Sequence, residues 1–357
     1  MGKIKICIIG AGNISNTRHI PAILQNEDMQ IVGIISDEKK KIVRTVKNHP
    51  CLKNCHMLVI NQTENVGEQL HNCEWFKRNV DAVIIGTPPK QHYPMVKASL
   101  ALGKHVLVEK PMMMNEQECD EVLLLAQSKQ VILYVMHSFQ FSKGVTELYN
   151  RYSKGELGKV KSILEIQLTN RNRRLPVWYN ELPLGLYYDE AAHFFYCARR
   201  FGGKLKVQNA HAVFNDGNDN TPRFLEAQLK AGEIPVQMYM NFNSPICEWG
   251  LIIIGEKKIA IYDYFKDILI VLKNDNQHYA KDVLRTSLSF FRQFWWGFFK
   301  NGIKMIRGKL LYGHDECIAR YAKAIKSKEN CFELSGELGK EVVQAMNVVI
   351  EYAKKDE

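Results

Sequence analysis

The stretch YYDEAAHFFY, residues 187–196, carries three ionisable side chains inside an otherwise apolar run. Its aromatic residues and alanines are typical of a buried helix, which does not normally contain such groups. Asp189 and His193 are four residues apart, so on a helix they lie one turn apart on the same face. A histidine can accept the proton of an alcohol, and a nearby carboxylate can orient the ring and stabilise its cation. The spacing therefore predicts an acid–base pair; the alternative is a core histidine with satisfied hydrogen bonds.

A glycine-rich turn follows the first apolar run of the chain. The segment KIKICIIGAGNIS predicts a strand over residues 4–9 that leads directly into Gly10 and Gly12. Gly10 permits a tight turn, and Gly12 lets the backbone approach a pyrophosphate at the N-terminus of the next helix. Ser15 occupies the third glycine position and is small enough for close packing. The residues predicted to bind a dinucleotide here are Gly10, Gly12, Asn13 and Ile14.

An acidic residue ends the next predicted strand. The run QIVGIISD ends in Asp37, 22 residues beyond Ser15. A carboxylate at this position accepts hydrogen bonds from the ribose 2′-hydroxyl and repels a 2′-phosphate, which favours NAD over NADP. The lysines at 39–41 partly offset that preference, so NADP is not excluded. The alternative for Asp37 is a solvated acid in a turn.

Alternating strands and helices position these residues. The β-rich runs DAVIIGTPP and HVLVEKP flank QHYPMVKASLALGK, which has helical apolar spacing. This alternation predicts an α/β fold, with a parallel sheet and crossover helices on its faces. The 357 residues exceed what one hydrophobic core usually serves, so we expect two domains.

Composition excludes several classes of function. The net charge is +10, but Lys and Arg are spread along the chain and no nucleic-acid-binding motif is present, so we expect no nucleic-acid partner. Nine cysteines without paired spacing favour a reducing cytoplasm over a disulfide framework. A zinc site at His49, Cys51, Cys55 and His56 lacks the usual ligand spacing, and we expect no metal.

The segments GAGNIS, TPPKQHYP, ALGKHVLVEKP and DEAAH occur together, and with them the chain resembles the Gfo/Idh/MocA oxidoreductases over nearly its full length. The resemblance implies a Rossmann NAD(P)-binding domain over residues 1–138. It also implies a substrate-binding and oligomerisation α/β domain over residues 139–357, with an open, mostly antiparallel sheet. Such proteins transfer a hydride between nicotinamide and a carbon of a sugar, cyclitol or related polyol. A homo-oligomer, either a dimer or a tetramer, is expected.

The resemblance also assigns individual residues. Lys110 takes the position of the catalytic lysine, and Asp189 and His193 take the positions of the acid–base pair. An ammonium group at Lys110 can stabilise the developing alkoxide of the substrate. The Lys110–Pro111 bond is expected to be cis. The remaining cofactor-binding residues that the resemblance implies are Thr87, Pro88, His92 and Glu109, together with Lys110.

The candidate substrate-binding residues are Gln140, Arg171, Trp178 and Tyr179. The arginine that the family frequently has after the sixth strand is absent here, and Gln140 lies nearby. Arg171 begins a basic cluster with Arg173 and Arg174 that suits a phosphate or nucleotide, unless it is a solvated loop. The two aromatic residues can stack on a sugar ring or fill the core. Glu190 is either a salt-bridge partner or a substrate contact, and the EAA spacer around it departs from the family pattern, so the substrate stays open.

Residues 285–313 carry six basic residues, no acids, two tryptophans and several phenylalanines. This composition is typical of an amphipathic helix on anionic lipid, and the alternative is a helix that packs on the sheet or on a partner subunit. No run of about 18 uncharged apolar residues is present, so we expect no transmembrane helix. The expected location is the cytoplasm, with peripheral membrane contact left open.

The sequence as a whole predicts an NAD(P)-dependent oxidoreductase. Its substrate would be a secondary alcohol of a sugar, a cyclitol, or a nucleotide- or phosphate-linked sugar. Two alternatives remain. One is a family member that re-uses tightly bound NAD for dehydration or lyase chemistry. The other is a non-catalytic NAD-binding sensor that associates with a membrane.

Overall fold

A computed structural model describes residues 2–61, 64–173, 175, 177–214, 220–307 and 310–355. Arg174 of the predicted basic cluster lies outside the described residues, as do Gly308 and Lys309 of the segment 285–313. The chain forms two compact units, Met1–Ser138 with His314–Gln344 and Phe139–Gly313 with Ala345–Glu357. The cysteines are all free.

The first unit is built on a six-stranded parallel sheet of order β3-β2-β1-β4-β5-β6. Its strands are β1 (Ile4–Ile9), β2 (Met29–Ser36), β3 (His56–Val59), β4 (Ala82–Ile85), β5 (His105–Val108) and β6 (Leu133–Val135). Its connecting helices include α1 (Ile20–Leu24), α2 (Lys39–Asn48), α3 (Val66–Asn72), α4 (Glu74–Asn79), α5 (His92–Ala101) and α6 (Glu116–Ser128).

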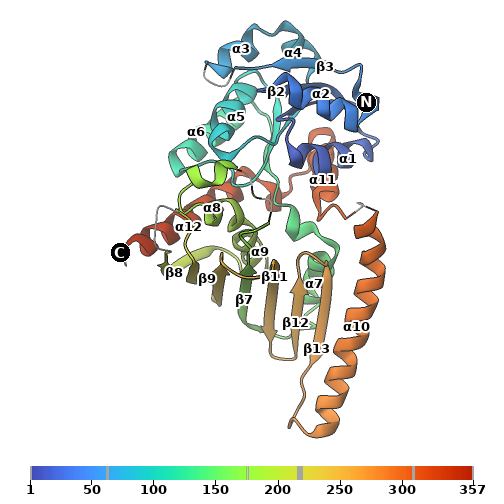
Figure 1. Ribbon diagram of the computed structural model, residues 1–357, viewed down its shortest axis with the longest axis vertical. Helices are drawn as coiled ribbons and strands as arrows, with labels where there is room; N and C mark the ends of the chain where they lie inside the picture. The colour runs from blue at the N-terminus through green and yellow to red at the C-terminus, as the bar shows by residue number, and fades with distance from the viewer. Residues whose placement is uncertain are drawn as a thin grey trace. The chain divides into compact units, whose positions relative to one another are not determined.

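Helices cover both faces of this sheet. Figure 1 shows α1 and α2 on one side and α5 and α6 on the other. The central strands are accordingly apolar on both faces; all four residues of β4 are buried. The strand order reverses between β1 and β4, which is the point where open α/β sheets bind ligands. The structure confirms the predicted Rossmann-type α/β fold.

The predicted division of the chain differs from the structure at residues 314–344. We expected everything after residue 138 in the second domain, but α11 (His314–Ser327) and the start of α12 (Gly336–Lys355) belong to the first unit. The Tyr321 hydroxyl donates to the Val83 carbonyl, and a β-bridge joins Tyr134 to Ser335. A Cβ on Gly339 would lie 2.7 Å from Val135, so α12 packs closely on β6. These contacts link residues far apart in the sequence, and local patterns do not reveal them.

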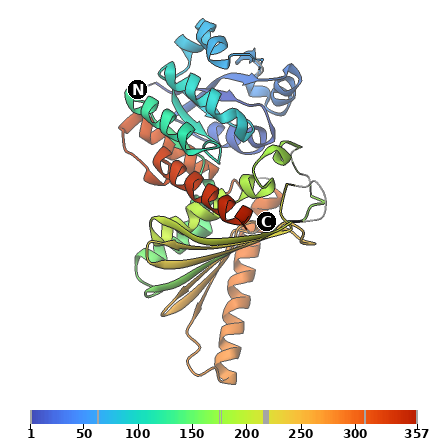
Figure 2. The ribbon, with the colours of Figure 1, turned by 90° about the vertical axis from the view of Figure 1, so that its left-hand side faces the viewer.

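The second unit contains a seven-stranded sheet of order β13-β12-β11-β7-β10-β9-β8. Neighbouring strands are antiparallel except for the parallel pair β7–β10, which confirms the predicted mostly antiparallel sheet. The strands are β7 (Val160–Leu168), β8 (Leu205–Val213), β9 (Phe224–Ala231), β10 (Ile234–Asn241), β11 (Glu248–Gly255), β12 (Lys258–Asp263) and β13 (Ile268–Lys273). Figure 2 shows them as one twisted layer.

The helices of the second unit include α7 (Lys143–Ser153), α8 (Leu186–Glu190), α9 (Ala192–Gly202) and α10 (Ala280–Ile306), together with the end of α12. Burial alternates along β7, whose Ile163, Glu165 and Gln167 lie on the face that is fully covered. Helix α9 contacts β7, β9 and β10, and α10 lies beside the edge strand β13. Among the described residues, no helix combines the length and the apolar character that a membrane span requires.

Candidate cofactor and catalytic site

The turn after β1 requires glycine at its first position. Gly10 has a φ of 98°, and a Cβ there would lie 2.7 Å from the carbonyl oxygen of Gly86. At Gly12 the nearest atom to an added Cβ is 3.9 Å away, so the surrounding protein does not itself demand glycine. A close approach by pyrophosphate therefore stays the predicted reason for Gly12.

Polar side chains hold this turn in place. Asn13 and Ile14 begin the helix after it, which continues as a π-helical turn over Ser15–His19. The Ser15 hydroxyl donates to the Gly10 carbonyl at 2.5 Å, which gives the serine at the third glycine position a structural role. Asn16, which the sequence reasoning missed, donates to the Gly12 carbonyl at 2.7 Å.

Asp37 follows β2, at the carboxyl end of the strand, as predicted for an acid that contacts ribose. Its two carboxylate oxygens accept hydrogen bonds from the Ser36 hydroxyl at 2.9 Å and from Lys41 at 2.6 Å. Partial burial would raise the pKa of Asp37, but the bonds from Lys41 and Ser36 outweigh it and lower the pKa. Asp37 is therefore an anion, and Lys41 already neutralises part of its charge.

The turns after β4 and β5 are tied together by His92. Its Nδ1 lies 2.9 Å from the Pro111 carbonyl oxygen and its Nε2 lies 3.0 Å from that of Thr87. Burial lowers the pKa of His92, although both carbonyls favour the charged ring. His92 thus fixes the two loops that were predicted to line the cofactor. The buried Oγ1 of Thr87 has no hydrogen-bond partner within the described part of the chain, so this hydroxyl can bind a ligand.

Glu109 lies at the end of β5, immediately before a cis Lys110–Pro111 bond, as predicted. Its Oε1 is 2.7 Å from Nε2 of His19 and 3.8 Å from Nε2 of His314. Burial would raise the pKa of Glu109, but the hydrogen bond from His19 and the charges of His19, His314 and Lys110 lower it to about 2. The carboxylate is therefore held as an anion beside the proposed catalytic lysine.

Neither histidine was among the site residues predicted from the sequence. His19 lies one turn after Ser15, where its position after the glycine turn could have drawn attention. His314 is 205 residues from Glu109 and carries no such signal. Within the described ranges, His19, Glu109 and His314 are the group close enough to share a metal ion. Because Nε2 of His19 and Oε1 of Glu109 are already joined directly at 2.7 Å, we interpret the group as a support for Glu109.

Asp189 and His193 lie on α8 and α9, which meet at Ala191. Ala191 keeps a right-handed helical backbone, with φ −62° and ψ −31°, so helical geometry continues from one helix into the other. His193 is buried, and the Phe139 ring lies 4.4 Å from its ring. The stretch was predicted to be a buried helix, and the aromatic residues and alanines around this histidine are buried.

Tyr196 orients the imidazole. Its hydroxyl lies 2.6 Å from Nδ1 of His193 and accepts a hydrogen bond from the Phe139 backbone N–H at 3.1 Å. Tyr196 was missed, although it stands three residues after His193 in the same stretch, where a helix places it on a neighbouring position. A base that acts through Nε2 is held by its other ring nitrogen in this way.

Glu190 is a buried salt-bridge partner. Its Oε1 forms an ion pair with Arg173, and its Oε2 accepts hydrogen bonds from the Gln167 amide and from the Thr169 hydroxyl at 3.2 Å. Burial lowers the pKa of Arg173, although the charge of Asp189 opposes this effect. Of the two roles considered for Glu190, the structure supports the ion pair. The Arg173 guanidinium therefore forms an ion pair and is not simply solvated on a loop.

The remaining candidate substrate residues lie in the second unit. Arg171 donates to the backbone carbonyls of Phe242 at 3.0 Å and Thr221 at 3.3 Å, so it anchors a loop. Gln140 is buried, and its backbone carbonyl accepts a hydrogen bond from Arg200. The half-buried Trp178 and Tyr179 lie in a short helical turn, Val177–Glu181. Contact of these four residues with substrate stays a prediction.

Part of the predicted site is brought together within the first unit. Gly10, Thr87 and Glu109 follow β1, β4 and β5, which are neighbours in the sheet, so the three residues share its carboxyl edge. An open pocket lined by Lys5, His56 and other residues lies near the first residues of strands β1 and β3 instead, away from these turns. Lys110 belongs to the first unit and the Asp189–His193 pair to the second, so their meeting stays a prediction.

Residues 4–137 match a family model described as an oxidoreductase family with an NAD-binding Rossmann fold. An uncharacterised oxidoreductase of Synechocystis is 29% identical over 45% of this chain and 40% of its own length. A myo-inositol 2-dehydrogenase of Thermotoga maritima is 24% identical over 80% of this chain and 77% of its own length. The chain spans less than half the length of the first curated relatives it matches.

The fold of the whole chain also has counterparts among solved structures. The WlbA dehydrogenase of Bordetella pertussis, crystallised with NADH and UDP-GlcNAcA, superimposes with a TM-score of 0.77 at 15% identity. The alignment covers 100% of this chain and 97% of that one. This likeness extends the shared fold beyond residue 137. The resemblance to the Gfo/Idh/MocA oxidoreductases seen in the sequence is thus confirmed by the match over residues 4–137, the part of the chain that carries the NAD-binding Rossmann fold.

Proposed function

We propose that this protein is an NAD(P)-dependent oxidoreductase that acts on a secondary alcohol of a sugar-type substrate. The observation that carries the proposal is the fixed, buried imidazole of His193, whose Nδ1 lies 2.6 Å from the Tyr196 hydroxyl. A histidine held this way in an apolar wall is suited to proton transfer through its other nitrogen. The anionic Glu109 next to Lys110 supports the same reading for the cofactor side of the site.

The first unit offers what a dinucleotide requires. Gly10 makes the tight turn, the Thr87 hydroxyl is available to a ligand, and Asp37 is an anion at the strand end. We propose NAD as the preferred cofactor, because Asp37 would repel a 2′-phosphate. When bound, the nicotinamide supplies hydride transfer to or from the carbon that bears the substrate oxygen.

The side chains of this protein would handle the proton and the charge. In the oxidation direction, the electron pair of the C–H bond leaves as hydride and the hydroxyl proton passes to Nε2 of His193, so a ketone forms. Lys110 would donate a hydrogen bond to the substrate oxygen and stabilise its developing negative charge. Asp189 would favour the protonated ring of His193. The reverse sequence reduces a ketone.

The proposed substrates are cyclitols, sugars and nucleotide- or phosphate-linked sugars. The relative named for myo-inositol supports the first class, and the neighbour crystallised with UDP-GlcNAcA supports the last. Arg171 and Arg173 give little support to a phosphate site, because the first binds backbone carbonyls and the second binds Glu190. We further propose a homo-oligomer formed through the less buried face of the second sheet, where Leu164 and Ile166 are only partly covered.

A substrate screen tests this function. The protein is incubated with NAD or NADP and a panel of inositols, free sugars and nucleotide sugars, and NAD(P)H is followed by absorbance. We expect turnover with one class, and a loss of about 10²- to 10⁴-fold in kcat for Lys110→Ala and His193→Ala. Substantial activity in either variant contradicts the mechanism. Tight NAD binding without net reduction by any substrate would instead indicate dehydration chemistry or a non-catalytic sensor.

A further inference from the structure

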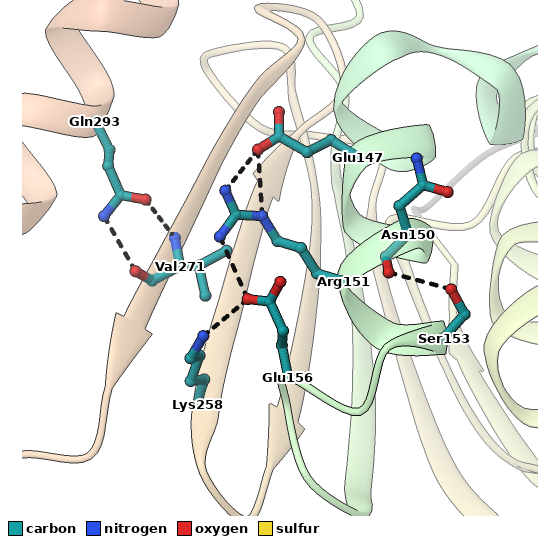
Figure 3. A network of polar contacts seen from close by, with 8 residues as sticks. All are labelled: Glu147, Asn150, Arg151, Ser153, Glu156, Lys258, Val271 and Gln293. Carbon is teal, nitrogen blue, oxygen red and sulfur yellow. Dashed lines mark hydrogen bonds and ion pairs between the residues drawn. The ribbon is translucent and has the colours of Figure 1, made fainter.

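Helix α10 (Ala280–Ile306) uses one face to cover the edge of the second sheet. The Gln293 side chain accepts a hydrogen bond from the Val271 N–H and donates one to the Val271 carbonyl, both at 3.0 Å (Figure 3). A Cβ on Gly297 would lie 3.0 Å from the side chain of Ile268. Asn301 donates to the Asp267 carbonyl at 2.6 Å. Because these residues recur every four positions, they define a single packed face of the helix.

The opposite face of α10 is apolar and exposed. Successive residues of a helix are rotated by about 100°, so residues spaced alternately by four and by three form one stripe along it. On α10 such a stripe lies about half a turn around the helix axis from Gln293. Its members are Leu284, Leu288, Phe291, Trp295 and Phe298, with Phe299 and Ile306 beside them. Phe291 is 62% exposed and Phe299 63% exposed. Large aromatic side chains gathered in this way on a surface mark an interaction site.

Basic residues accompany this apolar stripe. Arg285 and Arg292 lie about a quarter turn from its centre, whereas Lys300 and Arg307, toward the end of the helix, lie nearer to the side of Gln293. Arg285 forms an ion pair with Asp282 at 3.3 Å. Between residues 283 and 313 the sequence contains no Asp or Glu, so the other cations of this segment have no acid within it. Long basic side chains beside an apolar surface can extend to lipid phosphates.

This arrangement distinguishes between two occupants of the stripe. A second copy of α10 would bring cations of the same sign together without acids to separate them. An anionic bilayer supplies the opposite charge to the basic flank and an apolar layer to the aromatic stripe. The 27 residues of α10 span about 40 Å, which is long enough for many lipid contacts in the membrane plane.

We propose that α10 is a membrane-docking helix that lies in the surface of an anionic lipid bilayer. The stripe of Leu284, Leu288, Phe291, Trp295 and Phe298 enters the boundary between headgroups and acyl chains. Arg285 and Arg292, on the flank of the stripe, face the lipid phosphates. Gln293 and Asn301 keep the helix attached to the sheet, so the second unit is held at the membrane surface.

Vesicle sedimentation of the full chain tests the proposal. We expect the protein to sediment with phosphatidylglycerol–phosphatidylcholine vesicles, and to bind pure phosphatidylcholine vesicles about tenfold more weakly or worse. Added salt should weaken the first interaction. Phe291→Gln combined with Phe299→Gln should reduce vesicle affinity by about tenfold or more, because each buried aromatic is worth at least that factor. Arg285→Glu combined with Arg292→Glu should abolish the preference for anionic lipid.

Matched variants keep the test specific. Leu124→Gln removes an exposed apolar side chain on α6, 66% exposed, and Lys129→Glu reverses an exposed charge next to that helix. Both should sediment as the unchanged protein does, and all variants should keep its unfolding midpoint because the altered side chains are exposed. Failure to sediment with either vesicle overturns the proposal. So does a change of mass in light scattering on Phe291→Gln without any vesicle binding, which would show that the stripe joins two copies.

Discussion

The Nδ1 atom of His193 lies 2.6 Å from the hydroxyl oxygen of Tyr196, less than one turn further along α9. The same hydroxyl accepts a hydrogen bond from the Phe139 backbone, so the imidazole is tied to a loop that precedes α7. The sequence indicated Asp189 as the residue that orients this ring. The structure shows a contact to Tyr196, which carries no charge, and the role of Asp189 stays a prediction.

Tyr196→Phe removes the hydroxyl and leaves the ring of His193 without this partner. We expect kcat to fall by about tenfold, the value of one lost hydrogen bond, and the pH profile of kcat to shift. Stability should also drop by about 1–3 kcal/mol, because the Phe139 N–H loses its acceptor. Tyr187→Phe is the matched control: it loses a buried bond to the Met346 carbonyl, so it should destabilise without moving the profile. An unchanged profile in Tyr196→Phe contradicts the positioning role.

Glu109 should make the protein sensitive to acid. Its pKa falls from an ordinary 4.5 to about 2 in the folded state, which corresponds to roughly 3 kcal/mol. A depressed pKa stabilises the fold above the ordinary value, and this contribution is lost as the pH falls from about 4.5 toward 2. Urea unfolding at several pH values measures it. The stability advantage over Glu109→Gln should shrink across that window, and an advantage independent of pH would contradict the assignment.

Substitution of one partner in the ion pair between Arg173 and Glu190 should lower the stability of the protein. Glu190→Gln removes the ion-pair partner of the half-buried guanidinium, so we expect a loss of about 3 kcal/mol in the free energy of unfolding. The exposed pair of Lys161 and Glu256, 2.6 Å apart, provides the comparison. Glu256→Gln should cost less than about 1 kcal/mol. Equal effects in denaturant unfolding would mean that burial of Glu190 has little energetic importance.

Asp37 should determine the choice of cofactor. Asp37→Ser removes the charge that repels a 2′-phosphate and releases Lys41, so kcat/KM for NADP relative to NAD should rise by about tenfold or more. Glu38→Gln is the matched control, because Glu38 also pairs with Lys41 but is not predicted to contact ribose. The ratio should change little in that variant. A ratio unaffected by Asp37→Ser would show that another residue selects the cofactor.

The sequence predicted those features that depend on neighbours in the chain. The turn at Gly10 and the alternating strands follow from local patterns, and the structure contains them. The cis bond before Pro111 was implied by the family resemblance, and it is present as well. The partners of Glu109 and Glu190 could not be predicted in the same way. His314 reaches Glu109 only because α11 packs with the first unit, and Arg173 reaches Glu190 from a loop beyond β7. Such contacts form only when distant segments pack together, and the spacing of residues along one sequence does not show which segments will do so.

The side-chain amide of Gln293 offers an N–H donor and a C=O acceptor, as a peptide group does, but no further residues of a strand follow it. By pairing with both backbone groups of Val271, it acts toward β13 as a neighbouring strand one residue long. An open strand edge is a template on which other chains can add and aggregate. One glutamine, carried on a helix whose far side is apolar, therefore blocks further growth of this sheet at Val271 and leaves α10 free to serve a different surface.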